Sequence, residues 1–276
     1  MKTGNWDVSA VVAGTFRLDG GAMFGVVPKT LWSKVAPADD KNRISMAMRT
    51  LVIQGEGKTV VIDAGSGGGY GEKLETIYAF ADFAPLVVGL GLAPEDVTDV
   101  ILTHLHFDHA GGAAVPEGDG WRLAFPNAVH HVQKSQWDHA LSPNPRDRAS
   151  YFAPRIRLLE SLGALEIHDG DWSLAPGFDL LTFHGHTPGQ HLPRVSGGGA
   201  VLFYCGDLVP TTAHIPIPYV MAYDLDPVLA MEVKTAVLQR AAAENWILVF
   251  EHDPVVAACR VTADAGRFKA GDTVAL

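Results

Sequence analysis

One stretch decides how this chain is interpreted: Asp99-Val100-Ile101-Leu102-Thr103-His104-Leu105-His106-Phe107-Asp108-His109. The apolar residues at its start predict a short buried strand. A His-x-His-x-Asp-His motif follows directly. Side chains alternate along an extended backbone, so His104 and His106 point the same way. Asp108 and His109 come after the strand ends, where neighbours diverge, and they can serve a second ion.

Three later residues with metal-binding side chains also come directly after apolar runs. His186 follows the run ending at Phe183, Asp207 follows residues 201–205, and His252 follows residues 246–250. In α/β proteins, site residues gather just beyond the carboxyl ends of strands. Each of the three alone would be an ordinary hydrogen-bonded turn residue. Together with the motif, they predict a single site rich in histidine and aspartate.

A glycine-rich turn, residues 63–69, ends another predicted strand and begins with Asp63. The turn resembles a phosphate-binding loop only weakly, because no Lys-Ser or Lys-Thr pair follows it. We expect it to bring Asp63 beneath the site, where the carboxylate can hold a ligand histidine. Gly111 and Gly112, just after the motif, should let the backbone stay close to the same place.

Composition favours one globular domain spanning residues 1–276. Hydrophobic residues make up 47% of the chain and charged residues 19%, which is enough for a large core. The formal net charge of −10 argues against a nucleic-acid partner. No apolar run has the length of a membrane span, and no signal peptide is visible, so we expect a cytoplasmic protein without a membrane partner. Cys205 and Cys259 lie in apolar surroundings and predict buried free thiols.

The hydrophobic pattern also predicts the main elements. We expect a first strand over residues 7–18, helices over 72–90 and 150–162, and a last helix from Asp226 to near Asn245. Residues 246–250 predict a strand buried on both faces. Residues 20–34 are glycine-rich, carry apolar side chains and lack a regular period, so we expect a lip over the site, with a dimer contact as the alternative.

The motif and the later residues resemble those of the metallo-β-lactamase superfamily over roughly residues 45–255. The resemblance implies an α/β (α+β) chain folded as a four-layer αββα sandwich with the site at one edge of the two sheets. It also implies how the ligands divide. One metal ion would have His104, His106 and His186, the other would have Asp108, His109 and His252, and Asp207 would bridge both.

The resemblance implies two divalent metal ions as cofactors. Nitrogen and oxygen ligands suit zinc, and manganese, iron or cobalt also fit them. Two divalent ions, two carboxylates and a bridging hydroxide leave a small positive charge, which favours attack on an ester carbonyl or phosphoryl centre. Asp108 and Asp207 are therefore the expected catalytic residues. Asp108 can also pass a proton to the leaving alkoxide.

Residues 19–29 resemble a branch of quorum-quenching lactonases, and related branches hydrolyse organophosphate triesters. This implies a small-molecule substrate, a lactone or another ester, and a homodimer. Acyl-homoserine lactonases carry a tyrosine three residues after the bridging aspartate, where this chain has Pro210. Tyr219, Tyr223 or His214 could replace it. The residues expected to line the substrate pocket, with core packing as the alternative, are Phe24, Phe107, His214, Tyr219 and Tyr223.

Other classes remain open at the level of the sequence. A triesterase or another esterase would use the same site. An iron-dependent persulfide dioxygenase shares the fold but uses one metal with fewer ligands, so a metal count separates it from a hydrolase. A closed, non-catalytic metal site would leave no position for water.

Overall fold

Two seven-stranded sheets form the centre of the computed structural model, which describes residues 1–82 and 86–276. The first sheet has the strand order β1-β2-β3-β4-β5-β8-β9, and the second has the order β10 to β16. The strands of the first sheet are β1 (Lys2–Thr3), β2 (Trp6–Asp19), β3 (Arg43–Gly55), β4 (Lys58–Ile62), β5 (Asp99–Ile101), β8 (Val129–Gln133) and β9 (Leu165–His168). Those of the second are β10 (Trp172–Ala175), β11 (Phe178–Phe183), β12 (Gln190–Gly197), β13 (Ala200–Tyr204), β14 (Ile247–Val249), β15 (Ala258–Asp264) and β16 (Arg267–Thr273). A separate hairpin joins β6 (Ala114–Glu117) to β7 (Gly120–Leu123).

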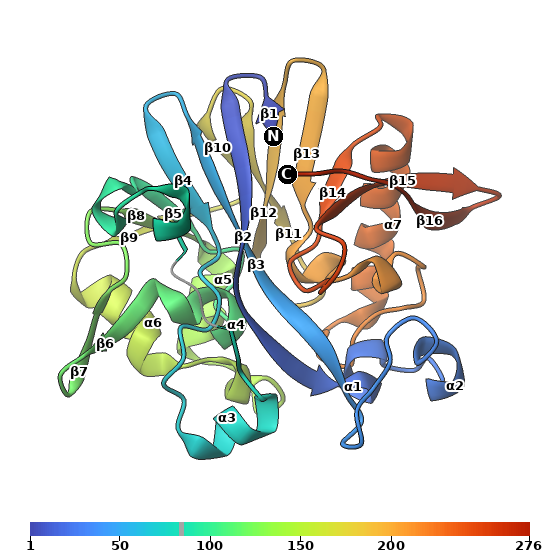
Figure 1. Ribbon diagram of the computed structural model, residues 1–276, viewed down its shortest axis with the longest axis horizontal. Helices are drawn as coiled ribbons and strands as arrows, with labels where there is room; N and C mark the ends of the chain where they lie inside the picture. Colours follow the sequence, from blue (N-terminus) through green and yellow to red (C-terminus); the bar gives the residue numbers. More distant parts are fainter. Residues whose placement is uncertain (83–85) are drawn as a thin grey trace.

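The sheets pack face to face because alternate strand residues are apolar on the inner faces. Trp6, Leu51 and Ile101 of the first sheet meet Phe178 and Tyr204 of the second in one buried cluster. Apolar clusters also cover the outer face of each sheet, where helices pack. Figure 1 shows α5 and α6 on the side of the first sheet and α7 on the side of the second. The predicted αββα sandwich is confirmed.

Seven α-helices lie among the described residues: α1 (Gly20–Phe24), α2 (Lys29–Trp32), α3 (Glu72–Tyr78), α4 (Phe107–Ala110), α5 (Lys134–Leu141), α6 (Ala153–Ser161) and α7 (Pro227–Ala243). Six 3₁₀ turns accompany them: η1 (Val88–Leu90), η2 (Pro94–Asp96), η3 (Gly111–Ala113), η4 (Arg148–Ser150), η5 (Gly206–Leu208) and η6 (Thr212–His214). The longest, α7, begins as expected: Asp226 accepts a hydrogen bond from the Leu229 amide at 3.0 Å, and Pro227 follows as the first helical residue. Within the described ranges, no helix is both long and apolar enough to cross a lipid bilayer.

The helix expected over residues 72–90 is wrong in its length. It ends at Tyr78, because Ala79 adopts a left-handed conformation with φ of 47°. Part of the prediction, residues 83–85, lies outside the described residues. The segment 20–34 holds the two short helices α1 and α2 rather than an irregular loop. The expected first strand and the strand over residues 246–250 are present as β2 and β14.

The topology brings the predicted site residues to one edge. Strands β4, β5 and β8 run parallel to one another, so their carboxyl ends meet. In the second sheet, β13 and β14 are also parallel, and Asp207 and His252 follow their carboxyl ends. The two sets of loops face each other across the sandwich, so residues from both halves of the chain share one site.

Candidate metal centre

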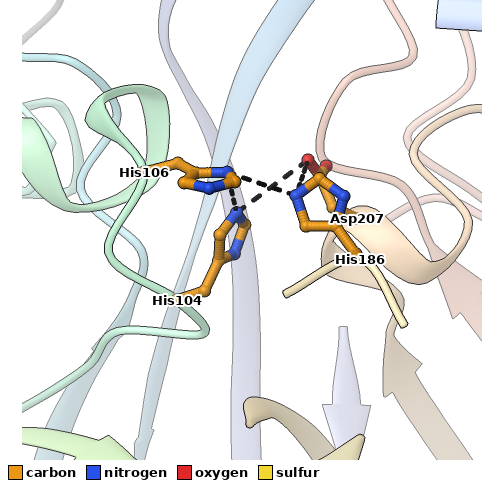
Figure 2. A group of neighbouring side chains, drawn as sticks. All are labelled: His104, His106, His186 and Asp207. Atoms are coloured by element: carbon orange, nitrogen blue, oxygen red, sulfur yellow. Dashed lines mark hydrogen bonds and ion pairs between the residues drawn. The ribbon is translucent and has the colours of Figure 1, made fainter. Parts of the chain in front are cut away.

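The first group of side chains joins the two halves of the molecule. His106 Nδ1 lies 3.1 Å from His104 Nε2 and 3.2 Å from His186 Nε2. Asp207 Oδ2 lies 3.1 Å from His186 Nε2 and 3.9 Å from His104 Nε2. Figure 2 shows these four side chains pointing toward one another, two from each half of the chain. All four are buried.

The second group lies on the other side of Asp207. His252 Nε2 is 3.2 Å from His109 Nε2 and 3.6 Å from Asp108 Oδ2. Asp207 Oδ1 lies 3.1 Å from His252 Nε2 and 3.6 Å from His109 Nε2. One carboxylate therefore presents Oδ2 to the first group and Oδ1 to the second.

These separations suit metal ions. Ligand atoms about 2.0–2.1 Å from a tetrahedral zinc ion lie about 3.3 Å from one another, and the observed pairs scatter around that value. Asp207 Oδ1 is buried and accepts no hydrogen bond from the described residues, although two imidazole nitrogens lie close to it. Nitrogen and carboxylate donors without a thiolate fit zinc or a neighbouring divalent metal. The residues therefore fit two divalent ions with Asp207 between them.

The electrostatics of the cluster also favour cations. Burial and the neighbouring histidines hold the pKa values of His104 and His106 well below the ordinary value, so both rings are neutral donors. Burial opposes a charge on His252 as well, but Asp207 and Glu251 outweigh it and raise its pKa to about 9. The negative charge around Asp207 thus draws protons onto nearby histidines, and divalent ions can take the place of those protons.

Asp63 contacts His109, one of the expected ligand histidines, as predicted. Its Oδ2 lies 3.0 Å from His109 Nδ1, and it accepts hydrogen bonds from the Thr103 amide and hydroxyl, each at 2.7 Å. The backbone of Asp63 has a φ of 54°, a left-handed conformation that is uncommon outside glycine. Glu251 Oε2 approaches the same nitrogen at 2.7 Å. Two buried acidic side chains therefore converge on the outer nitrogen of His109, and burial raises the pKa of one of them, Glu251, to about 8.

The turn over residues 63–69 packs tightly against the motif. A Cβ atom on Gly112 would lie 2.0 Å from the Ala64 carbonyl oxygen, so only glycine fits there. The buried Arg155 guanidinium donates to the Ser66 carbonyl at 2.5 Å and to the Gly111 carbonyl at 2.9 Å. This arginine joins the turn that begins at Asp63 to the end of the motif.

A cavity of about 50 Å³ opens over the centre. Phe107 and Tyr223, two of the residues expected to line a substrate pocket, do line it. Its full lining is Leu18, Met23, Tyr78, His106, Phe107, Asp108, Ser150, His186, Asp207, Met221, Tyr223 and His252. A larger cavity of about 440 Å³ shares Leu18, Tyr78 and Tyr223 with it, so the two are neighbours.

Phe24, His214 and Tyr219 are not part of this lining. Phe24 is fully buried and stacks on His214, with ring centroids 4.6 Å apart, and on Trp32 at 5.4 Å. Tyr219 packs edge-on against Phe24. His214 is held on both ring nitrogens, by Thr211 Oγ1 at 2.7 Å and the Met23 carbonyl at 2.9 Å. These contacts correct the expectation to core packing, and Met23 is the residue of the 20–34 segment that reaches the cavity.

Several residues that support the site were not predicted from the sequence. Asp224 Oδ1 lies 2.9 Å from His186 Nδ1, and Glu251 stands behind His109. Lys234 is buried and donates to the carbonyls of His214, Pro216 and Tyr219 at 3.1, 3.2 and 2.9 Å, which pins the loop before Tyr223. Glu251 directly precedes His252 and could have been suspected, whereas no local pattern marks Asp224 or Lys234.

Known proteins resemble this chain in sequence and fold. The family model for the metallo-beta-lactamase superfamily matches residues 49–252. An N-acyl homoserine lactonase of Bacillus thuringiensis is 29% identical over 167 residues, and the match spans 59% of each chain. The chain therefore spans less than two thirds of the length of that curated relative.

Two solved structures extend the comparison. A probable metal-dependent hydrolase from Staphylococcus aureus superposes with a TM-score of 0.88 and 29% identity, over 99% of this chain and 100% of its own. A dizinc quorum-quenching lactonase, AidC, solved with the product N-hexanoyl-L-homoserine, has a TM-score of 0.80 and 20% identity, over 100% of this chain and 97% of its own. At that identity the second likeness concerns the fold alone.

Proposed function

Because the chain belongs to the metallo-beta-lactamase superfamily, we propose that it is a dinuclear metal-dependent hydrolase that opens a lactone ring. The single observation that carries the proposal is the position of Asp207, with one carboxylate oxygen facing each group of ligands. In the proposed site, His104, His106 and His186 hold one divalent ion, Asp108, His109 and His252 hold the other, and Asp207 contacts both.

Two divalent ions bound there would supply a nucleophilic oxygen near neutral pH and positive charge for the oxyanion. The residues of the chain have the other roles. His104 and His106 stay neutral because they are buried, so their lone pairs remain available as ligands. Asp108 lies on the cavity wall, where it can accept a proton and pass it to the leaving alkoxide.

Tyr223 is the proposed hydrogen-bond donor to the substrate. It lines the cavity, and the turn that carries it is fixed, because the Met221 amide donates to Asp224 Oδ2 at 2.8 Å and Ala222 N donates to the Ala22 carbonyl at 2.8 Å. Burial raises the pKa of the Tyr223 hydroxyl, with smaller contributions from Tyr78, Asp19 and Asp108, so the group stays protonated. A neutral phenol beside the centre can donate to a developing oxyanion.

The shape of the site supports a compact reacting group. Phe107, Met23 and Leu18 give the cavity apolar walls, which exclude water from the reacting atoms. A lactone suits such a site because its leaving alkoxide stays tethered to the acyl group. The neighbouring cavity of about 440 Å³ could take a substituent of the ring, and its polar walls, Arg17, Lys41 and Arg43 among them, favour a substituent with hydrogen-bond acceptors.

Hydrolysis assays on protein of defined metal content test the proposal. We expect proton release from γ- and δ-lactones with two ions per chain, and little turnover of matched phosphotriesters. Asp108→Asn is the control, since it should lower turnover on every lactone while the first group keeps its ion. Inactivity on all lactones beside efficient cleavage of phosphotriesters would identify a triesterase, and full activity with one iron per chain on a persulfide would identify a dioxygenase.

A further inference from the structure

A second cluster of possible metal ligands lies away from the centre, on strands β8 and β9. Ligand atoms of His131, Glu166 and His168 lie within 4.8 Å of one another. The two strands are parallel, and His131 is in register with Glu166. Glu166 and His168 are two residues apart on β9, so their side chains leave the same face of the sheet. We refer to these three residues as the edge cluster, because β9 is the edge strand of its sheet.

The ring of His131 is oriented from behind by a carboxylate. His131 Nε2 lies 2.9 Å from Asp99 Oδ1. Although burial opposes ionisation of Asp99, hydrogen bonds from His131, Thr98 and Lys58 lower its pKa, so it is an anion that accepts the Nε2 proton. The other nitrogen, Nδ1, is then left with its lone pair directed toward His168. A carboxylate holding the far nitrogen is the usual arrangement behind a histidine that binds a metal.

His168 completes a pair of nitrogen donors. Its Nε2 lies 2.9 Å from His131 Nδ1 and 3.6 Å from Glu166 Oε1. Burial and the neighbouring His131 lower the pKa of His168, so the ring is neutral near pH 7. Nitrogens 2.9 Å apart fit an ion about 2.0–2.1 Å from each, and an opening of a few tenths of an ångström would reach tetrahedral spacing. The His168 ring also stacks on Trp172, with centroids 3.7 Å apart and planes at 6°.

We propose that His131, His168 and Glu166 bind a third divalent ion, with zinc the metal that suits two imidazoles and a carboxylate. The side chain of Glu166 is 57% exposed, whereas His131 is buried, so the ion would enter from solvent and keep water in its remaining positions. Such an ion would link the edge strand β9 to β8 through its ligands. Its expected effect is on stability, and it does not depend on the reaction proposed above.

The test counts ions in the whole protein with both groups of the metal centre already filled. At buffered free zinc in the micromolar range, we expect elemental analysis to find three ions per chain. His168→Gln should bind two, because glutamine can still donate a hydrogen bond to His131 Nδ1 but lacks the imidazole ligand. Zinc should also change the fluorescence of Trp172 and raise the melting temperature of the wild type, and it should do neither in His168→Gln.

Two further variants distinguish a metal site in the edge cluster from a plain hydrogen bond and from zinc bound at another histidine. His139→Gln alters a histidine held by Asp147 outside the edge cluster, and it should keep three ions. Glu166→Gln changes an exposed side chain, so it should fold normally and bind the third ion at least about tenfold more weakly. Two ions in the wild type would show that His131 and His168 form only a hydrogen bond. A third ion retained by His168→Gln would lie elsewhere. Either result overturns the proposal.

Discussion

The two groups of ligands on either side of Asp207 differ in what lies behind them. In the first group, His186 is held by Asp224, His104 Nδ1 lies 3.1 Å from the Thr103 hydroxyl, and His106 Nε2 is buried with no partner among the described residues. In the second group, His109 Nδ1 contacts two carboxylates, those of Asp63 and Glu251, and His252 Nδ1 contacts the Ala47 carbonyl at 2.8 Å.

The difference concerns charge. The second group has a carboxylate of its own, Asp108, and two acidic residues, Asp63 and Glu251, behind His109. The first group has three imidazoles and one acidic residue, Asp224, behind His186. Anionic surroundings stabilise a divalent cation, and neutral ones do so less. We therefore infer that the second group holds its ion more tightly than the first. The predictions below test this ranking, starting with the largest expected effect.

The largest effect is expected from Asp207→Ala, because this residue faces both groups. Its loss removes the shared anion that balances the surrounding histidines, so both ions and all measurable turnover should be lost together. Elemental analysis and lactone hydrolysis on the same preparation measure this. If the variant kept the ion of the second group at normal affinity, Asp207 would belong to the first group only and the bridge would be wrong.

The sandwich was implied by the resemblance that the motif and the strand-end residues carry, and the positions of those residues indicated which side chains come together. This worked because parallel strands bring their carboxyl ends to one edge whatever the intervening sequence. Asp63 was also predictable, since it ends a strand next to the motif strand. Asp224 was not predictable, because a turn far along the chain brings it behind His186. The periodicity of apolar residues carries no information about such a contact.

The pocket-lining predictions were less successful for a related reason. Phe24 ends the short helix α1 and His214 ends the 3₁₀ turn η6, and the sequence does not reveal which of these segments packs against which. They pack against each other, so their side chains are covered before they reach the cavity. Phe24→Ala should therefore destabilise the protein, by about 3–5 kcal/mol, rather than alter substrate affinity selectively.

A matched pair of variants compares the groups directly. Asp63→Asn should weaken binding of the second ion about 10- to 100-fold, because the amide no longer supports the charge behind His109. Asp224→Asn should weaken the first ion by a similar factor and leave the second unchanged. Competition with a chelator, followed by ion counting, gives both affinities. Equal loss of both ions in each variant would mean that the groups bind as one unit.

Partial removal of metal from the wild type tests which group binds its ion more tightly. A graded chelator should remove one ion first, and we expect it to be the ion of the first group. Asp224→Asn should then speed the first loss, and Asp63→Asn should speed the second, as followed by ion release over time. The opposite pattern would reverse the ranking and would mean that the acids behind His109 are there to orient the ring.

Tyr223→Phe tests the side of the centre that faces the substrate. The variant keeps the ring on the cavity wall and removes the hydroxyl, so metal content should not change. Loss of a hydrogen bond to a charged oxyanion corresponds to about 1.5–3 kcal/mol, or roughly a 10- to 150-fold fall in kcat/KM. Tyr78→Phe, on the same wall, is the matched control and should have a smaller effect. Equal effects would mean that neither hydroxyl has a specific role.

The smallest effect concerns a histidine outside both groups, His130, whose ring nitrogens contact no carboxylate among the described residues. His130 is fully buried, its Nδ1 lies 3.2 Å from the Ala128 carbonyl, and its Nε2 has no partner among the described residues. Burial lowers the pKa of His130 to about 4, below the value near 6.5 expected in the unfolded chain. Below about pH 6.5, His130 therefore binds a proton in the unfolded state but not in the folded state. The contribution of His130 to stability is fully present above about pH 6.5 and is lost progressively down to about pH 4, by up to about 1.4 kcal/mol per pH unit.

His130→Asn can keep the hydrogen bond to Ala128 without this titration, so its stability relative to the wild type should rise between about pH 6.5 and about pH 5 in urea unfolding. Parallel pH curves for the two proteins would mean that His130 is protonated as readily in the folded state as in the unfolded one.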